Sequence, residues 1–64
     1  MFLKNNLKNI LDLRKISQRE LSKNTGIKEA TISRYVKGDR RINIVNAIKI
    51  AKFLDLEVDT IWEL

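Results

Sequence analysis

The chain has 64 residues, of which 44% are hydrophobic and 33% are charged, and it contains neither cysteine nor histidine. This composition is that of a globular protein rather than a disordered tail, and the length allows one small domain with a compact core. Without cysteine or histidine the chain lacks a disulfide framework and the usual zinc ligands, so we expect a metal-free protein.

The net charge of +5, from 13 Lys and Arg against 8 Asp and Glu, indicates an anionic partner. Nucleic acid and an anionic lipid surface both fit that charge. The basic residues outnumber the acidic ones in residues 28 to 41, whereas residues 53 to 64 carry acidic residues and no base. We therefore expect one end of the molecule to face an anion and the other end to lie away from it.

Neither a membrane span nor a signal peptide is expected. No segment approaches the roughly 18 uninterrupted apolar residues of a transmembrane helix. Lys4, Lys8 and Asp12 interrupt the apolar residues near the N-terminus, where a signal peptide has a continuous apolar region. These features predict a soluble, cytoplasmic protein.

The spacing of apolar residues predicts helices and shows no strand pattern. A first helix is expected over roughly residues 2 to 14. Ser17 followed by Glu20 is a capping box, which predicts that a second helix begins at Gln18. We expect this helix to end at Gly26, because a glycine just past a helix adopts the left-handed conformation at little steric cost.

Three further helices are expected after that turn. One runs from about residue 28 to 37 and is closed by Gly38, the next is capped by Asn43, and a short last one covers residues 58 to 63. The apolar residues at helical spacing are expected to form the core: Leu7, Leu11, Ile16, Leu21, Ile27, Ile32, Val36, Ile44, Ile48, Ala51 and Leu54.

Two short helices joined by a tight glycine turn are typical of a helix-turn-helix, here over about residues 18 to 37. Ideal helical angles place Ile32, Tyr35 and Val36 on one side of the second of these helices. The opposite side is small, polar and basic, and it carries Ala30, Ser33, Arg34 and Lys37. A helix with such a face fits the major groove of duplex DNA.

The run QRELSKNTGIKEATISRYVKG resembles the helix-turn-helix of the phage repressor and Cro family, also called the xenobiotic-response-element class of bacterial transcriptional regulators. The shared positions are Gln18, Leu21, Gly26, Ile27, Ile32 and Gly38. The run INIVNAIKIAKFLDLEVDTIWEL is similar to the family's fourth and fifth helices, so the resemblance covers nearly the whole chain. It implies an all-α fold, a compact five-helix bundle of the lambda-repressor-like DNA-binding type, with one domain over residues 1 to 64.

Four positions differ from the residues usual in that family. Ser22 stands where alanine is usual, and Lys28 stands where a serine or threonine often caps the recognition helix. Val36 replaces an acidic residue, and Ile42 replaces a proline. We expect none of these differences to break the fold.

The resemblance implies DNA contacts from helices 2 and 3. The residues expected to read bases are Glu29, Ala30, Ser33 and Arg34. Arg34 would bond guanine with two hydrogen bonds, Ala30 would touch a thymine methyl group, and Glu29 would accept from a cytosine amino group. The residues expected to contact phosphates are Ser17, Gln18, Lys28, Lys37, Arg40 and Arg41.

Each of these roles has a simpler alternative. Arg34 is otherwise an ordinary exposed arginine, and Gln18 a solvated residue in the first turn of its helix. Glu29 can instead orient Lys28 or Gln18, and residues 40 and 41 can belong to a solvated charged loop.

The favoured function is that of a sequence-specific, double-stranded DNA-binding transcriptional regulator of the repressor or Cro type, with a recognition helix over about residues 28 to 37. The alternative is an antitoxin-like or anti-repressor module that binds another protein through an apolar C-terminal surface. The polar face of residues 30 to 37 favours DNA. A membrane-surface role is weaker, because the basic residues do not share a helix with a broad apolar face.

No enzymatic activity is expected, because the chain lacks histidine, cysteine and a phosphate-binding glycine loop. No cofactor, metal or small-molecule ligand is expected either. The remaining expected partner is a second copy of the chain, in a homodimer that reads a palindromic operator. The residues assigned to the dimer surface are Phe53, Ile61, Trp62 and Leu64. Together with Ile50 they are more large apolar side chains than a thin bundle readily buries. In the alternative, a monomer folds its last helix back over the core.

Overall fold

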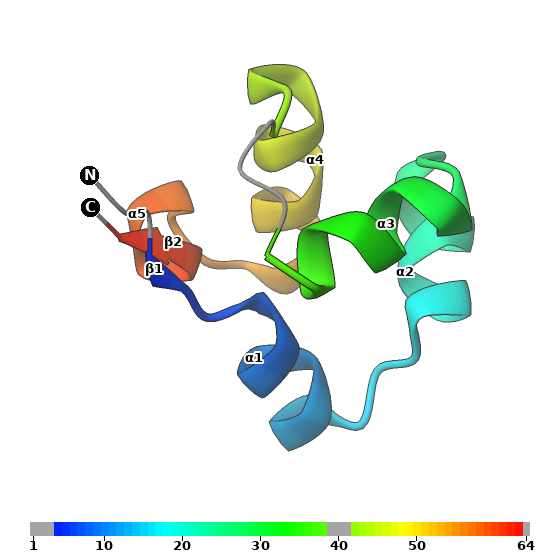
Figure 1. Ribbon diagram of the computed structural model, residues 1–64, viewed down its shortest axis with the longest axis horizontal. Helices are drawn as coiled ribbons and strands as arrows, with labels where there is room; N and C mark the ends of the chain where they lie inside the picture. The colour runs from blue at the N-terminus through cyan, green and yellow to red at the C-terminus, as the bar shows by residue number, and fades with distance from the viewer. Residues whose placement is uncertain (1–3, 39–41, 64) are drawn as a thin grey trace.

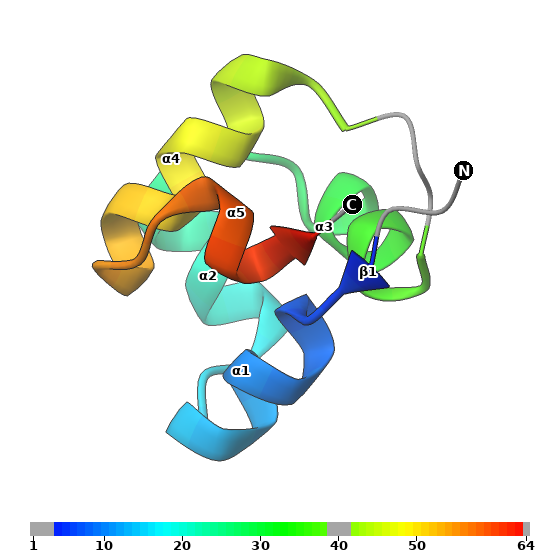
Figure 2. The same cartoon turned by 90° about the vertical axis from the view of Figure 1, so that its left-hand side faces the viewer.

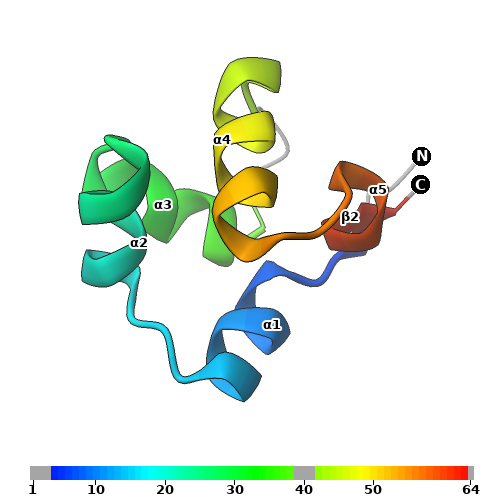
Figure 3. The same ribbon diagram turned by 180° about the vertical axis from the view of Figure 1, so that it is seen from behind.

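The computed structural model describes residues 4–38 and 42–63. Its helices are α1 (Leu7–Arg14), α2 (Gln18–Thr25), α3 (Glu29–Val36), α4 (Ile44–Leu54) and α5 (Val58–Ile61), and its strands are β1 (Lys4–Asn5) and β2 (Trp62–Glu63). Figures 1 and 3 show α4 in the middle, with α2 and α3 on one side of it and α5 and the strands on the other. The all-α class and the five helices predicted from the sequence are confirmed. None of the helices in the described ranges is long and apolar enough to span a membrane.

Side-chain caps begin two of the helices where the sequence predicts. The Ser17 hydroxyl accepts a hydrogen bond of 3.0 Å from the backbone N–H of Glu20, at the start of α2. The side-chain oxygen of Asn43 accepts from the backbone N–H groups of Val45 and Asn46 at 2.7 and 3.4 Å, at the start of α4. Both caps satisfy backbone donors that the helix itself leaves unpaired.

The first helix is shorter than predicted, because it begins at Leu7 rather than near residue 2. The chain before it is extended, and the side-chain oxygen of Asn5 accepts from the N–H of Leu7 at 2.9 Å. The end of α1 is tied to the centre of the fold, since the guanidinium of Arg14 donates to the backbone carbonyl of Leu54, the last residue of α4. A cation at that position stabilises the negative end of the helix dipole.

The last helix is also shorter than predicted, since residues 62 and 63 form a strand. Strand β2 pairs antiparallel with β1, with Asn5 opposite Trp62, and the two lie side by side in Figure 2. Asn6 continues the pairing, since its backbone N–H donates to Ile61 O at 2.8 Å and its side chain donates to Thr60 O at 3.0 Å. The sequence predicts no strand because two residues are too few to show an alternating pattern. This pairing closes the fold by joining its two ends.

Most of the residues expected in the core are buried or partly buried, but two residues of α4 are not. Ile44 and Ile48 are 66% and 42% exposed, so their assignment to the core is wrong. The described residues that are buried and hydrophobic are Leu7, Leu11, Leu21, Ile27, Ile32, Tyr35, Ala47, Ile50, Ala51, Leu54, Ile61 and Trp62. Ile16 and Val36 are partly buried against them. The error arises because α4, IVNAIKIAKFL, is apolar on nearly every side, so its pattern does not single out one face.

The expected dimer surface at the C-terminal end is also wrong for its two central residues. Ile61 is fully buried and Trp62 is 5% exposed, because α5 and β2 fold back beside α4. Ile50, which was expected to add to this apolar surface, is fully buried as well. Phe53 is partly buried against the core, and Leu64 lies outside the described residues. The side chains of Ile50, Ile61 and Trp62 therefore stabilise the protomer rather than offering a free surface.

We predict that Trp62→Ala lowers the free energy of unfolding by about 3–5 kcal/mol, since it removes a large buried side chain from the core. Urea denaturation followed by far-ultraviolet circular dichroism measures the loss. Leu13→Ala is the control: Leu13 is 84% exposed, so the change is expected to stay within about 0.5 kcal/mol. Equal midpoints for wild type and Trp62→Ala would contradict the packing of this side chain.

Candidate nucleic-acid interface

The turn between α2 and α3 is built around Gly26, as the sequence predicts. Gly26 has a φ of 76°, in the left-handed region that glycine adopts without strain, and its N–H donates to Ser22 O at 2.9 Å. The Ser22 hydroxyl donates to Ile27 O at 2.5 Å, which bonds α2 to the residue after the turn. The hydroxyl of Thr25 donates to Leu21 O at 2.7 Å. Ser22, which departs from the family's usual alanine, thus gains a role in fixing the turn.

Helix α3 presents two faces, and they are the ones predicted. Ile32 is fully buried and Tyr35 is 4% exposed, with Val36 packed at the edge of the core. The opposite face is exposed at Ala30, Arg34 and Lys37 and partly exposed at Ser33. Glu29, at the first position of α3, is exposed as well. Three of the residues predicted to read bases, Ala30, Ser33 and Arg34, therefore share one accessible side of α3, and the fourth, Glu29, is exposed at its first position.

Tyr35 fixes the C-terminal end of α3. Its backbone carbonyl accepts from the side-chain amide of Asn5 in β1 and from the N–H of Gly38 at 3.1 Å. Its hydroxyl accepts from the side-chain amide of Asn46 in α4 at 3.0 Å. The turn at Gly26 fixes the other end of α3. The orientation of α3 is therefore set by that turn and by hydrogen bonds from β1 and α4.

The start of α2 lies close to the end of α3. A groove between them is lined by Ser17, Gln18 and Val36, and by Lys8 and Asp12 of α1. Ser17 is exposed and Gln18 partly so, which leaves both accessible to a phosphate beside the groove. Lys8 is a further basic residue beside this groove, and it was not among the phosphate contacts predicted from the sequence.

Lys28 and Lys37 lie at the two ends of α3. Lys28 is the N-cap residue, it is exposed, and its side chain makes no capping bond, in contrast to the serine or threonine usual in the family. The positive N-terminal end of α3 therefore has no side-chain cap. Lys37 is exposed just after the helix. Arg40 and Arg41, the other two expected phosphate contacts, lie outside the described residues.

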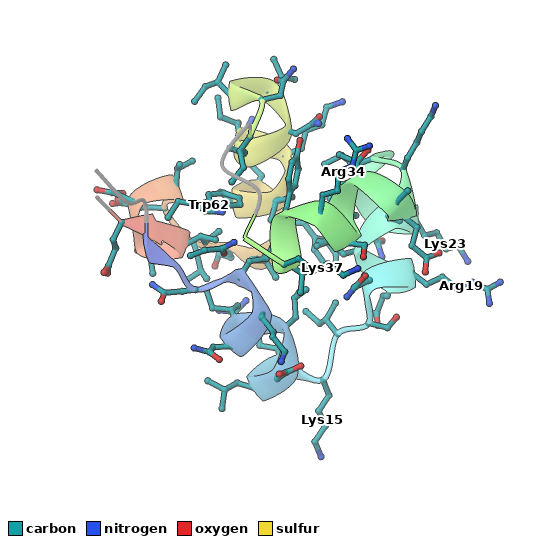
Figure 4. All side chains as sticks on the ribbon, viewed as in Figure 1. Lys15, Arg19, Lys23, Arg34, Lys37 and Trp62 are labelled. Atoms are coloured by element: carbon teal, nitrogen blue, oxygen red, sulfur yellow. The ribbon has the colours of Figure 1, made fainter. Side chains whose placement is uncertain are left out.

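A second group of bases was missed from the sequence. Lys15, Arg19 and Lys23 are all exposed, and Figure 4 shows them projecting outward along α2 and the loop that precedes it. The spacing of Arg19 and Lys23 could have revealed these two, because residues four apart on a helix share a face, whereas Lys15 lies in the loop before α2. The three residues add positive charge on α2 and on that loop.

The family comparison agrees with this geometry. A model of the helix-turn-helix family matches residues 7–61, which is most of the chain. The chain therefore belongs to the helix-turn-helix family of Cro/C1 type, a class of DNA-binding proteins with the lambda-repressor-like all-α fold. No curated protein matched the chain.

We predict that Gly26→Val destabilises the protein by about 1–3 kcal/mol, because a β-branched residue is strained at positive φ. A Cβ built on Gly26 meets no atom within 4 Å, so the cost comes from the backbone and not from a clash. Thermal unfolding measures it. Gly26→Asn is the control and should lose less, since asparagine tolerates the left-handed region better. An unchanged melting temperature for Gly26→Val would show that the turn does not need this conformation.

Proposed function

We propose that the protein is a sequence-specific, double-stranded DNA-binding transcriptional regulator of the repressor or Cro type, acting in the cytoplasm, with α3 in the major groove. The observation that carries the proposal is the division of α3 into two faces. One face packs Ile32 and Tyr35 into the core, and the other exposes Ala30 and Arg34 on a helix whose two ends are held by the fold.

The exposed face of α3 has the size and chemistry for base recognition. With its side chains an α-helix is about 10–12 Å across, which matches the width of the major groove, about 12 Å. Arg34 is the residue with the most specific partner, because its planar guanidinium matches the two acceptors of guanine. Ala30 and Ser33 are small enough to let the helix backbone come close to the bases. Glu29 at the first position is suited to accept from cytosine.

Positive charge around α3 would position the protein on the phosphates without reading sequence. Gln18 at the start of α2 and Lys28 and Lys37 at the ends of α3 flank the recognition face. Lys15, Arg19 and Lys23 continue the positive surface along α2, where they would meet phosphates further along the duplex. Arg40 and Arg41 remain proposed phosphate contacts on the basis of the sequence.

Two copies are proposed to act together on a palindromic operator. One recognition helix presents only Glu29, Ala30, Ser33 and Arg34 to the bases, which is too few to specify a site in a genome. A two-fold dimer doubles the number of contacts and places its half-sites about one helical turn, roughly 34 Å, apart. The alternative function, a protein-binding module using the C-terminal surface, loses support because Ile61 and Trp62 are buried.

We predict that Arg34→Ala weakens binding to the preferred duplex by about 1–3 kcal/mol and relaxes preference at one base position. Lys37→Ala removes an equal charge from the end of the same helix and should weaken binding to all duplexes alike. Fluorescence anisotropy on the preferred and a scrambled duplex at one salt concentration measures both. Equal losses on both duplexes for both variants would contradict the assigned roles.

The dependence of affinity on salt gives a separate prediction. If each subunit neutralises about four phosphates, the slope of log affinity against log salt is on the order of −7 for two subunits and about half that for one. Titrations over a range of salt concentrations, with a palindromic duplex and a single half-site, measure the two slopes. Equal slopes on the two duplexes would show that only one subunit binds.

A further inference from the structure

A groove lies between the C-terminal end of α2 and the C-terminal half of α4. It is lined by Asn24 and Thr25 of α2 and by Lys49, Lys52 and Phe53 of α4, and we call it the α2–α4 groove. Figure 3 shows these two helices at the front of the fold. The groove has a volume of about 390 Å³, which is enough to receive a large side chain of another molecule.

The polar groups that the α2–α4 groove offers to a partner are two ammonium groups. Lys49 and Lys52 are both exposed and lie three residues apart, so they share one face of α4. Within residues 4–38 and 42–63 neither lysine forms an ion pair. The side chains of Asn24 and Thr25 already donate to carbonyls of their own helix, at 2.8 and 2.7 Å. An anionic partner would relieve the repulsion between the two lysines.

The same surface also has an apolar component. Phe53 is half-buried, since it packs against the core and also lines the groove. Val45 and Ile48, which are 55% and 42% exposed, lie on the same face of α4 as Lys49 and Lys52. Exposed apolar side chains that are grouped and bordered by polar ones mark an interaction site. A matching partner therefore combines negative charge with a large apolar side chain.

The α2–α4 groove lies apart from the recognition face of α3. Ile32 and Tyr35 point from α3 into the core, so the exposed face of that helix points away from the core. Helix α3 lies in front of α2 in Figure 1 and behind α2 in Figure 3, which views the fold from the opposite side. A molecule in the groove therefore leaves the side of α3 that carries Arg34 uncovered.

An acidic protein segment uses this surface more fully than other anions do. DNA phosphates would pair with the two lysines but would place nothing apolar on Phe53. A lipid surface takes up apolar side chains that protrude, whereas Phe53 is recessed between two helices. A peptide that carries carboxylates beside an aromatic or large aliphatic side chain matches both the charges and the ring.

We propose that the α2–α4 groove binds an acidic segment of a partner protein, with an apolar side chain of that segment on Phe53 and its carboxylates paired with Lys49 and Lys52. Grooves between helices commonly receive peptides through such apolar anchors. For the complex on DNA, the proposal rests on the proposed function. There the regulator holds its operator with α3 and the partner with the opposite side of α2 and α4.

The association is expected to be transient and sensitive to salt. Exposed ion pairs contribute little each, so the apolar anchor supplies much of the affinity and the lysines supply selectivity for acidic segments. Screening is strong at such an exposed site, because the Debye length is about 10 Å at 0.1 M salt. Binding should therefore weaken as salt is raised.

The test begins with a displayed library of random peptides, from which binders of the wild-type protein are selected. We expect the selected peptides to carry carboxylates close to an aromatic or large aliphatic residue. Each is then measured by fluorescence anisotropy against Lys49→Gln/Lys52→Gln and against Lys15→Gln/Lys37→Gln, a control that removes the same charge from exposed positions outside the groove. The first variant should bind about tenfold more weakly than the control, and both should melt as wild type does.

Two further measurements separate the possible occupants. Amide signals of the labelled protein should shift at Asn24, Lys49 and Phe53 when a selected peptide is added, and Lys49→Gln/Lys52→Gln should bind the preferred duplex as tightly as wild type, with or without peptide. Selected peptides without carboxylates, equal peptide affinity for the two double variants, or shifts confined to α3 would overturn the proposal. A loss of duplex affinity would assign the lysines to phosphates, and binding to anionic phospholipid vesicles that depends on them would assign them to lipid. If wild type binds no duplex, the proposed function fails, and the peptide measurements alone decide the groove.

Discussion

The left-handed turn at Gly26 is the constraint on which the recognition surface depends. It ends α2 and starts α3 within three residues, and the hydroxyl of Ser22 bonds across it to the carbonyl of Ile27. Because the turn fixes the direction of α3, burial of Ile32 and Tyr35 on one side necessarily exposes Arg34 on the other. A change in the turn would rotate α3 and separate its polar face from the basic residues of α2.

The remainder of the fold holds α3 where the turn places it. The side chain of Asn5 reaches the C-terminal end of α3 from β1, and that of Asn46 reaches it from α4. Strand β1 pairs in turn with β2, whose Trp62 is buried beside α4. A surface held in this way needs little reordering when it binds, so less of the interaction energy is lost to conformational entropy. The short strands therefore help to hold α3 in place, although they lie far from it in sequence.

Local chemistry was predictable from the sequence, and long-range packing was less so. The Ser17 cap, the Gly26 turn and the two faces of α3 follow from residues within a few positions of one another. The buried face of α4 does not, because apolar residues such as Ile44 and Ile48 surround that helix and only its neighbours decide which side is covered. The burial of Trp62 depends in the same way on a two-residue strand pairing with a segment nearly sixty positions earlier in the chain. The shared face of Arg19 and Lys23 on α2 also follows from their four-residue spacing, whereas Lys15 lies in the loop before that helix.

The central claim, that α3 and the start of α2 bind DNA, is tested most directly by following backbone amide signals in nuclear magnetic resonance. The labelled protein is titrated with a duplex selected from a random pool at fixed salt. The account predicts that the largest shifts fall at Gln18 and at Ala30 and Arg34 of the recognition face, while the amides of α5 and β2 change little. Shifts concentrated on α5 and β2, with α3 unchanged, would contradict it.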